Sequence, residues 1–140
     1  MKKIFNLIVV CSICTMMLGC GSTASSAKVS DLSGTWKQTN SSSKDSYQEA
    51  VISNGVIEIN YISDSGDTKS LYWSGSYDAP AQEVSEYSWD SKNDTSKTGT
   101  SLLASGDATK TMSYKDGVLS YSASMMGTTT TVKLEKVEEK

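Results

Sequence analysis

Apolar and polar residues alternate with a period of two over most of the chain beyond residue 30, and Gly-containing turns interrupt the alternation. This pattern predicts antiparallel strands, because no stretch there shows the 3.6-residue apolar period of a helix. Within residues 47–62, the pair Asn54-Gly55 is typical of a two-residue hairpin turn, since both positions must accept positive φ. The turn sets Ile52 opposite Ile57, so that apolar side chains share one face.

Apolar residues also lie opposite each other across predicted turns in the C-terminal third of the chain. Asp116-Gly117 sets Tyr114 against Leu119, and a weaker turn at Met126-Gly127 sets Leu119 against Leu134. A slip of one residue in either pair would turn the apolar face to solvent, so the agreement supports this register. We predict a three-stranded meander over residues 109–115, 118–125 and 128–137.

A strand between these hairpins carries several aromatic residues. Alternation places Leu71, Trp73 and Tyr77 on one face. Tyr72 is out of phase with them, so we expect it to point outward and to serve as an anchor for a partner. To keep Leu71 on the inner face, the loop over residues 62–68 must contain a β-bulge.

About eight antiparallel strands in residues 31–137 predict an all-β domain, a small up-and-down barrel that encloses either packed side chains or one small ligand. The first strand contains Gly34-Thr35-Trp36. Here the chain resembles the lipocalin and streptavidin superfamily, whose first strand opens with Gly-x-Trp. The resemblance implies that Trp36 closes the barrel floor. Lipocalins cover this Trp with an arginine, which the chain lacks, and Lys133 or Lys136 could replace it.

Aliphatic residues are scarce in this domain, and aromatic residues compensate for them. Only 16 of the 107 residues from 31 to 137 are Ile, Leu or Val, a proportion that would also suit a disordered chain, but ten are Trp or Tyr. These aromatics either fill the core or line a cavity or interface in which their hydroxyl and indole N–H groups form hydrogen bonds. The candidate ligand or partner contacts are Tyr72, Trp73, Tyr77, Tyr87 and Trp89.

The first residues predict a lipoprotein signal peptide. Two lysines precede a short apolar run over residues 4–18, which is too short to span a bilayer. The run ends in Met17-Leu18-Gly19-Cys20, which resembles the lipobox of bacterial lipoproteins. The resemblance implies a signal peptide over residues 1–19 and a thioether-linked diacylglycerol on Cys20, with acyl chains such as palmitate. Residues 20–30 are then the lipidated cysteine and a flexible polar tether with a reach of roughly 15–18 Å.

This interpretation places the protein on the extracytoplasmic face of the cell membrane, anchored through acylated Cys20. The lysine-only basic residues and the residues after Cys20 weakly favour a Gram-positive source. A redox or metal-binding pair at Cys11 and Cys14 is the rival hypothesis. It is disfavoured because both lie within the apolar run and the chain has no histidine to complete a metal site.

Charge and residue types narrow the range of functions. Removal of the leader would leave 11 basic against 16 acidic residues, a net charge of −5, which disfavours nucleic acid as a partner. Histidine is absent, and the one cysteine of the mature chain would be acylated, so we predict no enzyme, no cofactor and no metal site. Carboxylate pairs such as Glu83 with Glu86, or Asp64 with Asp67, are expected to be solvated loop residues.

Two binding functions remain. The first is a monomeric lipocalin-like module for a small apolar or amphipathic ligand. The alternative is a protein–protein interaction or inhibitor module at the cell envelope, of the kind that inhibits lysozyme or excludes superinfecting phage.

Overall fold

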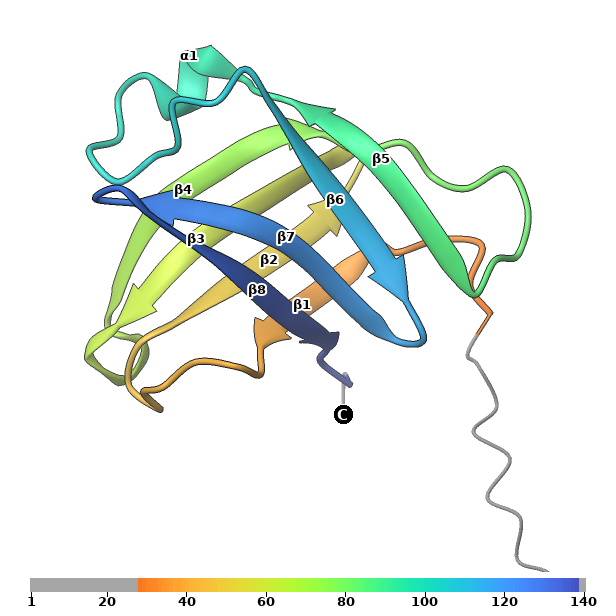
Figure 1. Cartoon of the computed structure of the whole chain (residues 1–140), viewed down its shortest axis with the longest axis horizontal. Helices are drawn as coiled ribbons and strands as arrows, with labels where there is room; N and C mark the ends of the chain where they lie inside the picture. The colour runs from red at the N-terminus through yellow and green to blue at the C-terminus, as the bar shows by residue number, and fades with distance from the viewer. Residues whose placement is uncertain (1–27, 139–140) are drawn as a thin grey trace, which may run out of the picture.

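The alternating segments form eight antiparallel strands in the computed structural model, which describes residues 28–138 (Figure 1). The strands are β1 (Gly34–Gln38), β2 (Tyr47–Ser53), β3 (Val56–Ser63), β4 (Thr68–Ser76), β5 (Glu86–Lys92), β6 (Thr109–Lys115), β7 (Val118–Met125) and β8 (Thr128–Lys136). A 3-10 turn, η1 (Asp64–Gly66), joins β3 to β4, and a short helix, α1 (Thr95–Thr98), follows β5. The strands form one curled sheet in the order β4-β3-β2-β1-β8-β7-β6-β5, which confirms the predicted up-and-down barrel. The predicted signal peptide and Cys20 lie outside the described residues.

The predicted hairpin registers are confirmed. Ile52 pairs with Ile57 across the first turn, and Leu119 pairs with both Tyr114 and Leu134 in the C-terminal meander. Met126 adopts a φ of 51° in the last turn, a backbone conformation that is unfavourable for a residue with a long side chain. The register across this hairpin thus holds although its turn residue is unfavourable.

The first and last strands of the sheet order, β4 and β5, close the barrel along a seam with few backbone hydrogen bonds. One isolated bridge joins Gly75 to Asn93. Side chains complete the closure, because the Trp73 indole donates to the Ser91 hydroxyl at 3.0 Å. A Cβ at Gly75 would lie 2.6 Å from the backbone oxygen of Lys92, so this close approach requires glycine.

The β-bulge lies within β4 and not in the loop before it. The register of β3 and β4 shifts between Ile59 and Asn60, which face Trp73 and Leu71, so Tyr72 is the extra residue. Two consecutive side chains of a bulged strand can then point to the same face. The expectation that Tyr72 points outward is therefore wrong: its exposed fraction is 1%.

Aromatic side chains fill the interior of the barrel. Seventeen buried apolar residues form one cluster, each no more than 6% exposed, and its largest fully buried members are Trp36, Trp73, Tyr72 and Tyr114. Edge-to-face packing adds to the area that they bury, as between Trp36 and Tyr114, whose ring centroids are 6.1 Å apart. The scarcity of aliphatic residues is thus compensated by Trp and Tyr.

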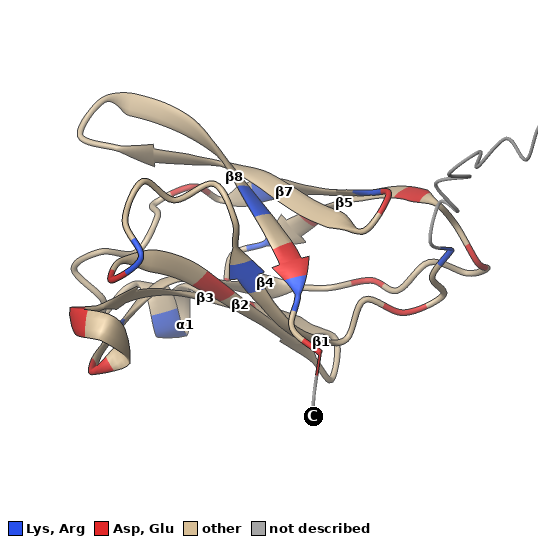
Figure 2. Ribbon diagram, turned by 90° about the horizontal axis from the view of Figure 1, so that it is seen from below, with Lys and Arg blue, Asp and Glu red and all other residues tan. Residues whose placement is uncertain are grey.

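The two ends of the barrel differ. The described chain begins and ends at one of them, which also carries the turns at 54–55 and 116–117; we call it the closed end. The loops over residues 39–46, 64–67 and 93–108 and the turn at 126–127 lie at the other end, which we call the mouth. Figure 2 shows the β7–β8 hairpin reaching this end along the upper side of the view. Within residues 28–138, no helix has the length and apolar character needed to cross a membrane.

Candidate functional site

Trp36, for which the Gly-x-Trp resemblance implies a role in closing the barrel floor, is buried beside the segment that precedes β1. Its indole donates to the backbone oxygen of Leu32 at 2.9 Å, and its side chain is 2% exposed. The Lys136 ammonium lies 5.9 Å from the ring centroid, within the range of a cation–π interaction. Gly34 makes this possible, because a Cβ there would lie 2.7 Å from the Lys136 side chain. Of the two lysines suggested by the sequence, Lys136 therefore covers the Trp.

Tyr77 ties the segment before β1 to the closed end. Its hydroxyl accepts from the Leu32 amide at 2.8 Å and donates to the Asp31 carboxylate at 3.1 Å. Burial and the adjacent carboxylate raise the pKa of Tyr77 to about 12. Hydrogen bonds from Ser33 and from this phenol lower the pKa of Asp31. Tyr77 is thus a structural residue of the closed end.

The five aromatic candidates from the sequence do not form one site. Tyr72, Trp73, Tyr77 and Trp89 are all buried in the core cluster. Tyr87 is half-buried, stacks on Trp89 at 5.8 Å and donates to a backbone oxygen of the loop between β4 and β5. Of these residues, only Tyr72 lies beneath the mouth, where the arrangement of polar groups suggests binding.

A hollow of about 430 Å³ opens at the mouth between the inner faces of β1–β3 and the β7–β8 hairpin. One side is polar and the other largely apolar. Its lining comprises Gln38, Gln48, Tyr61, Thr128 and Thr130 together with Ala123, Met125, Met126 and Val132. We call this hollow the mouth pocket. It has the mixed lining expected for an amphipathic ligand.

Three phenols and one amide form the floor beneath this pocket. Tyr72 packs edge-on against Tyr61 at 5.4 Å and is stacked with Tyr121 at 6.3 Å. The Tyr121 hydroxyl donates to the Gln48 side-chain oxygen. Burial raises the pKa of Tyr121 well above its usual range, and it also raises the pKa of Tyr61, an effect that a hydrogen bond with Gln48 partly offsets. Tyr61 and Tyr121 therefore stay protonated near neutral pH.

The Tyr72 hydroxyl is the one group of this floor without a polar partner in the described structure. It is buried and forms no hydrogen bond with the described residues. An unpaired buried hydroxyl costs about 1–3 kcal/mol, so its retention beside a pocket points to a missing partner.

Lys110 is a buried residue of this region that sequence analysis missed. Its ammonium contacts the Asp107 carboxylate at 2.8 Å and the Ser122 backbone oxygen at 3.1 Å, and it lies 5.4 Å from the Tyr72 ring centroid. The hydrogen bond from Lys110 lowers the pKa of Asp107. A signal existed in the sequence, because Lys110 is in phase with the inward-facing Met112. The side chain bridges β6 and β7 where their ladder has ended.

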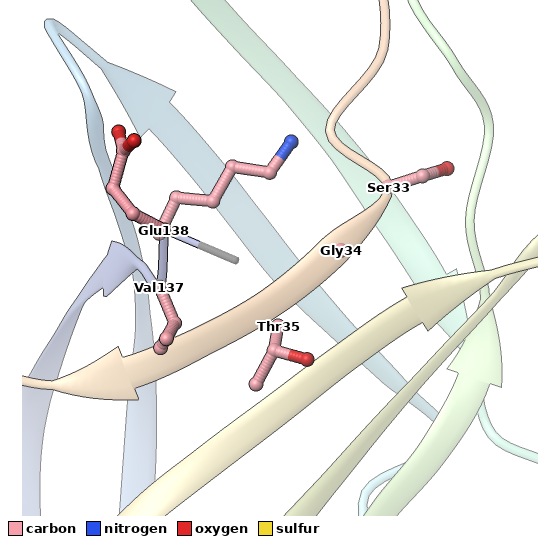
Figure 3. A pocket seen from close by; sticks show the side chains of 6 residues that line it. Ser33, Gly34, Thr35, Val137 and Glu138 are labelled. Carbon is pink, nitrogen blue, oxygen red and sulfur yellow. The ribbon is translucent and has the colours of Figure 1, made fainter. Parts of the chain in front are cut away.

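A second hollow, of about 440 Å³, lies beside the closed end (Figure 3). Ser33, Gly34 and Thr35 form one side of it, and residues 136–138 form the other. Its charged groups are one lysine and one glutamate of opposite sign, and it has no buried polar group in need of a partner. The mouth pocket is therefore the stronger candidate.

The acidic pairs considered as alternatives are widely exposed. Asp64 accepts from the Thr68 hydroxyl at 2.7 Å and so stabilises the η1 turn. Within the described part of the chain, no three acidic side chains are grouped so as to hold a metal ion. Comparison with protein-family models, with curated proteins and with solved structures finds no match for this chain.

Proposed function

We propose that this protein is a membrane-anchored extracytoplasmic lipoprotein that binds a small amphipathic ligand in the mouth pocket and catalyses no reaction. The observation that carries the proposal is the pocket itself, whose lining residue Tyr61 packs against Tyr72, a buried residue whose hydroxyl has no hydrogen-bond partner among the described residues. The packed interior leaves the mouth as the place for a ligand, in contrast to the central cavity of a hollow barrel.

The position of the mouth supports the anchoring part of the proposal. The described chain enters at the closed end, where Val29 already pairs with Val84. An anchor on Cys20 would therefore hold the closed end toward the membrane and leave the mouth facing outward. Such an orientation suits a binding protein of the cell surface.

Two neighbouring residues of β8 allow a matched test. Thr130 lines the pocket, whereas Thr129 pairs with Ser124 on the opposite face of the hairpin, and both are exposed. We would titrate the full chain carrying Cys20→Ser, which has no acyl chains to compete, with the fluorescent probe N-phenyl-1-naphthylamine. Thr130→Arg should abolish the fluorescence increase, and Thr129→Arg should preserve it.

Two results would refute this proposal. If the parent chain gives no saturable fluorescence increase, the protein is not a binder of small apolar molecules. If both arginine variants bind the probe as the parent does, the ligand does not enter the mouth pocket.

A protein partner is the second candidate, and the β7–β8 hairpin favours it. No charged residue lies between Asp116 and Lys133, and Met126 is fully exposed at the tip. Figure 2 shows the outer part of this hairpin without acidic or basic residues. If a protein binds the outer face of the hairpin, Thr129→Arg should prevent the anchored chain from retaining an envelope protein. If only Thr130→Arg prevents retention, the protein does not bind the outer face.

A further inference from the structure

The mouth pocket has no charged side chain in its lining. Its polar groups are two amides, one phenol and two threonine hydroxyls, contributed by Gln38, Gln48, Tyr61, Thr128 and Thr130. A charged ligand head would lose its hydration there without gaining a counter-charge, which is strongly unfavourable. The lining therefore selects against ionic head groups.

The one buried lysine among residues 28–138 is already paired. Lys110 is bound to Asp107 at 2.8 Å, and its side chain is 5% exposed. It also donates to the Ser122 backbone oxygen, so its position is set by two strands of the barrel. Lys110 is not part of the pocket lining, and Asp107 already neutralises its charge, so it offers no free counter-charge to an anionic head.

The floor offers hydrogen bonds to a neutral head. Tyr61 is half-buried at the pocket surface, and Gln48 is only 4% exposed beside it. Tyr72 lies directly behind Tyr61, and its hydroxyl has no partner among the described residues. Because that hydroxyl is buried, the proposed complex requires the Tyr61 ring to move aside and expose it to the ligand. One polar group of the ligand would then satisfy it.

We propose that the ligand of the mouth pocket is an uncharged amphipath whose hydroxyl- or ester-bearing head bonds to Gln48, Tyr61 and Tyr72. Its short apolar chain lies beneath the hairpin, against Met125 and Val132. This inference rests on the proposed small-ligand function and specifies its chemistry. A monoacylglycerol has the required combination of hydroxyl groups, ester and acyl chain.

The test compares three eight-carbon competitors in the displacement of N-phenyl-1-naphthylamine from the full chain carrying Cys20→Ser. Monooctanoylglycerol is neutral, octanoate is anionic and octyltrimethylammonium is cationic. We expect the neutral competitor to displace the probe at a concentration at least about ten-fold lower than either ion. Tyr72→Phe should weaken the neutral competitor roughly three- to ten-fold, as expected for one lost hydrogen bond. The matched variant Tyr87→Phe, at the closed end, should leave it unchanged.

Each other outcome overturns a defined part of the inference. Equal displacement by the three competitors, or a preference for either ion, would refute the neutral head while leaving probe binding intact. Equal effects of Tyr72→Phe and Tyr87→Phe would remove Tyr72 from the site. Failure of the parent chain to bind the probe would refute the proposed function, and the ligand class with it.

Discussion

The two stacked phenols beneath the mouth provide the sharpest stability prediction. Tyr72 and Tyr121 are both buried, and their rings lie 6.3 Å apart, but only one hydroxyl has a partner. Tyr121 donates to Gln48, whereas the Tyr72 hydroxyl is unpaired. Removal of the same oxygen atom should therefore change the free energy of unfolding in opposite directions.

The magnitudes follow from the state of each hydroxyl. Tyr72→Phe removes an unsatisfied buried group and should stabilise the ligand-free protein by about 1–2 kcal/mol. Tyr121→Phe breaks a hydrogen bond and leaves the acceptor oxygen of Gln48, which is 4% exposed, without its donor. It should destabilise the protein by about 1–3 kcal/mol.

The assay is urea unfolding at pH 7, followed by tryptophan fluorescence. With an m-value of about 1.5 kcal/mol/M, a change of 1 kcal/mol moves the midpoint by roughly 0.7 M. Equal m-values for the three proteins would show that the variants change stability alone. A midpoint for Tyr72→Phe below that of the parent would refute the reasoning, because it would mean that the hydroxyl is satisfied in the free protein.

Four further predictions concern the frame of the barrel. Lys110→Ala should destabilise it by about 3 kcal/mol in urea unfolding, through loss of a charge-assisted hydrogen bond and a buried stem. Lys110→Met, which keeps the stem, should stay within about 1 kcal/mol of the parent, and a loss as large as that of the alanine variant would contradict the role of the stem. Met126→Asn should raise the free energy of unfolding by about 0.5–1 kcal/mol, because φ is 51° at this position. A melting temperature equal to or below that of the parent would argue against backbone strain at Met126. Gly75→Ala should destabilise by about 2–3 kcal/mol, since its Cβ would meet the Lys92 backbone oxygen at 2.6 Å; an unchanged urea midpoint would show that the seam can open. Because the pKa of Tyr77 is raised to about 12, its contribution to stability is complete below about pH 10 and is lost as the pH rises toward 12. Tyr77→Phe should therefore reduce the fall in the free energy of unfolding between about pH 10 and pH 12. An equally steep fall in the variant would assign the loss of stability to other groups.

Sequence patterns sufficed to predict the hairpins because two independent constraints agreed at each one. The turn residues Asn54 and Asp116 accept positive φ, and the apolar period set the register on both sides of each turn. The agreement even predicted the last hairpin correctly, where Met126 is a poor turn residue. Pairing of the apolar faces outweighs the local preference there.

The bulge was misplaced because a single extra residue reverses every alternation beyond it. Counting outward from Trp73 assigns Leu71 to the core and Tyr72 to the surface, but the structure puts Tyr72 in the core and leaves Leu71 opposite Asn60. A bulge in the loop and a bulge within the strand satisfy the same hydrophobic pattern. Only the three-dimensional pairing distinguishes them.

The candidate site was harder to predict than the fold, because its residues have no distinctive chemistry. Gln48 and Tyr61 are ordinary polar residues of a strand, and they face each other only through the pairing of β2 and β3. Lys110 was overlooked because a lysine on a strand is usually solvated, although its phase was that of the core. An unpartnered hydroxyl, such as that of Tyr72, is a property of packing and leaves no trace in the sequence.

The orientation of the barrel connects the neutral ligand to the proposed location. The mouth lies a strand length, roughly 25 Å, from the closed end, and the predicted tether would add to its distance from the membrane. If the proposed anchor on Cys20 holds the closed end toward the membrane, a ligand would reach the mouth from the aqueous side. The mature chain would carry a net charge of −5, which repels anions before they reach the mouth. A neutral amphipath meets no such opposition, so long-range electrostatics and the uncharged pocket lining favour the same class of ligand.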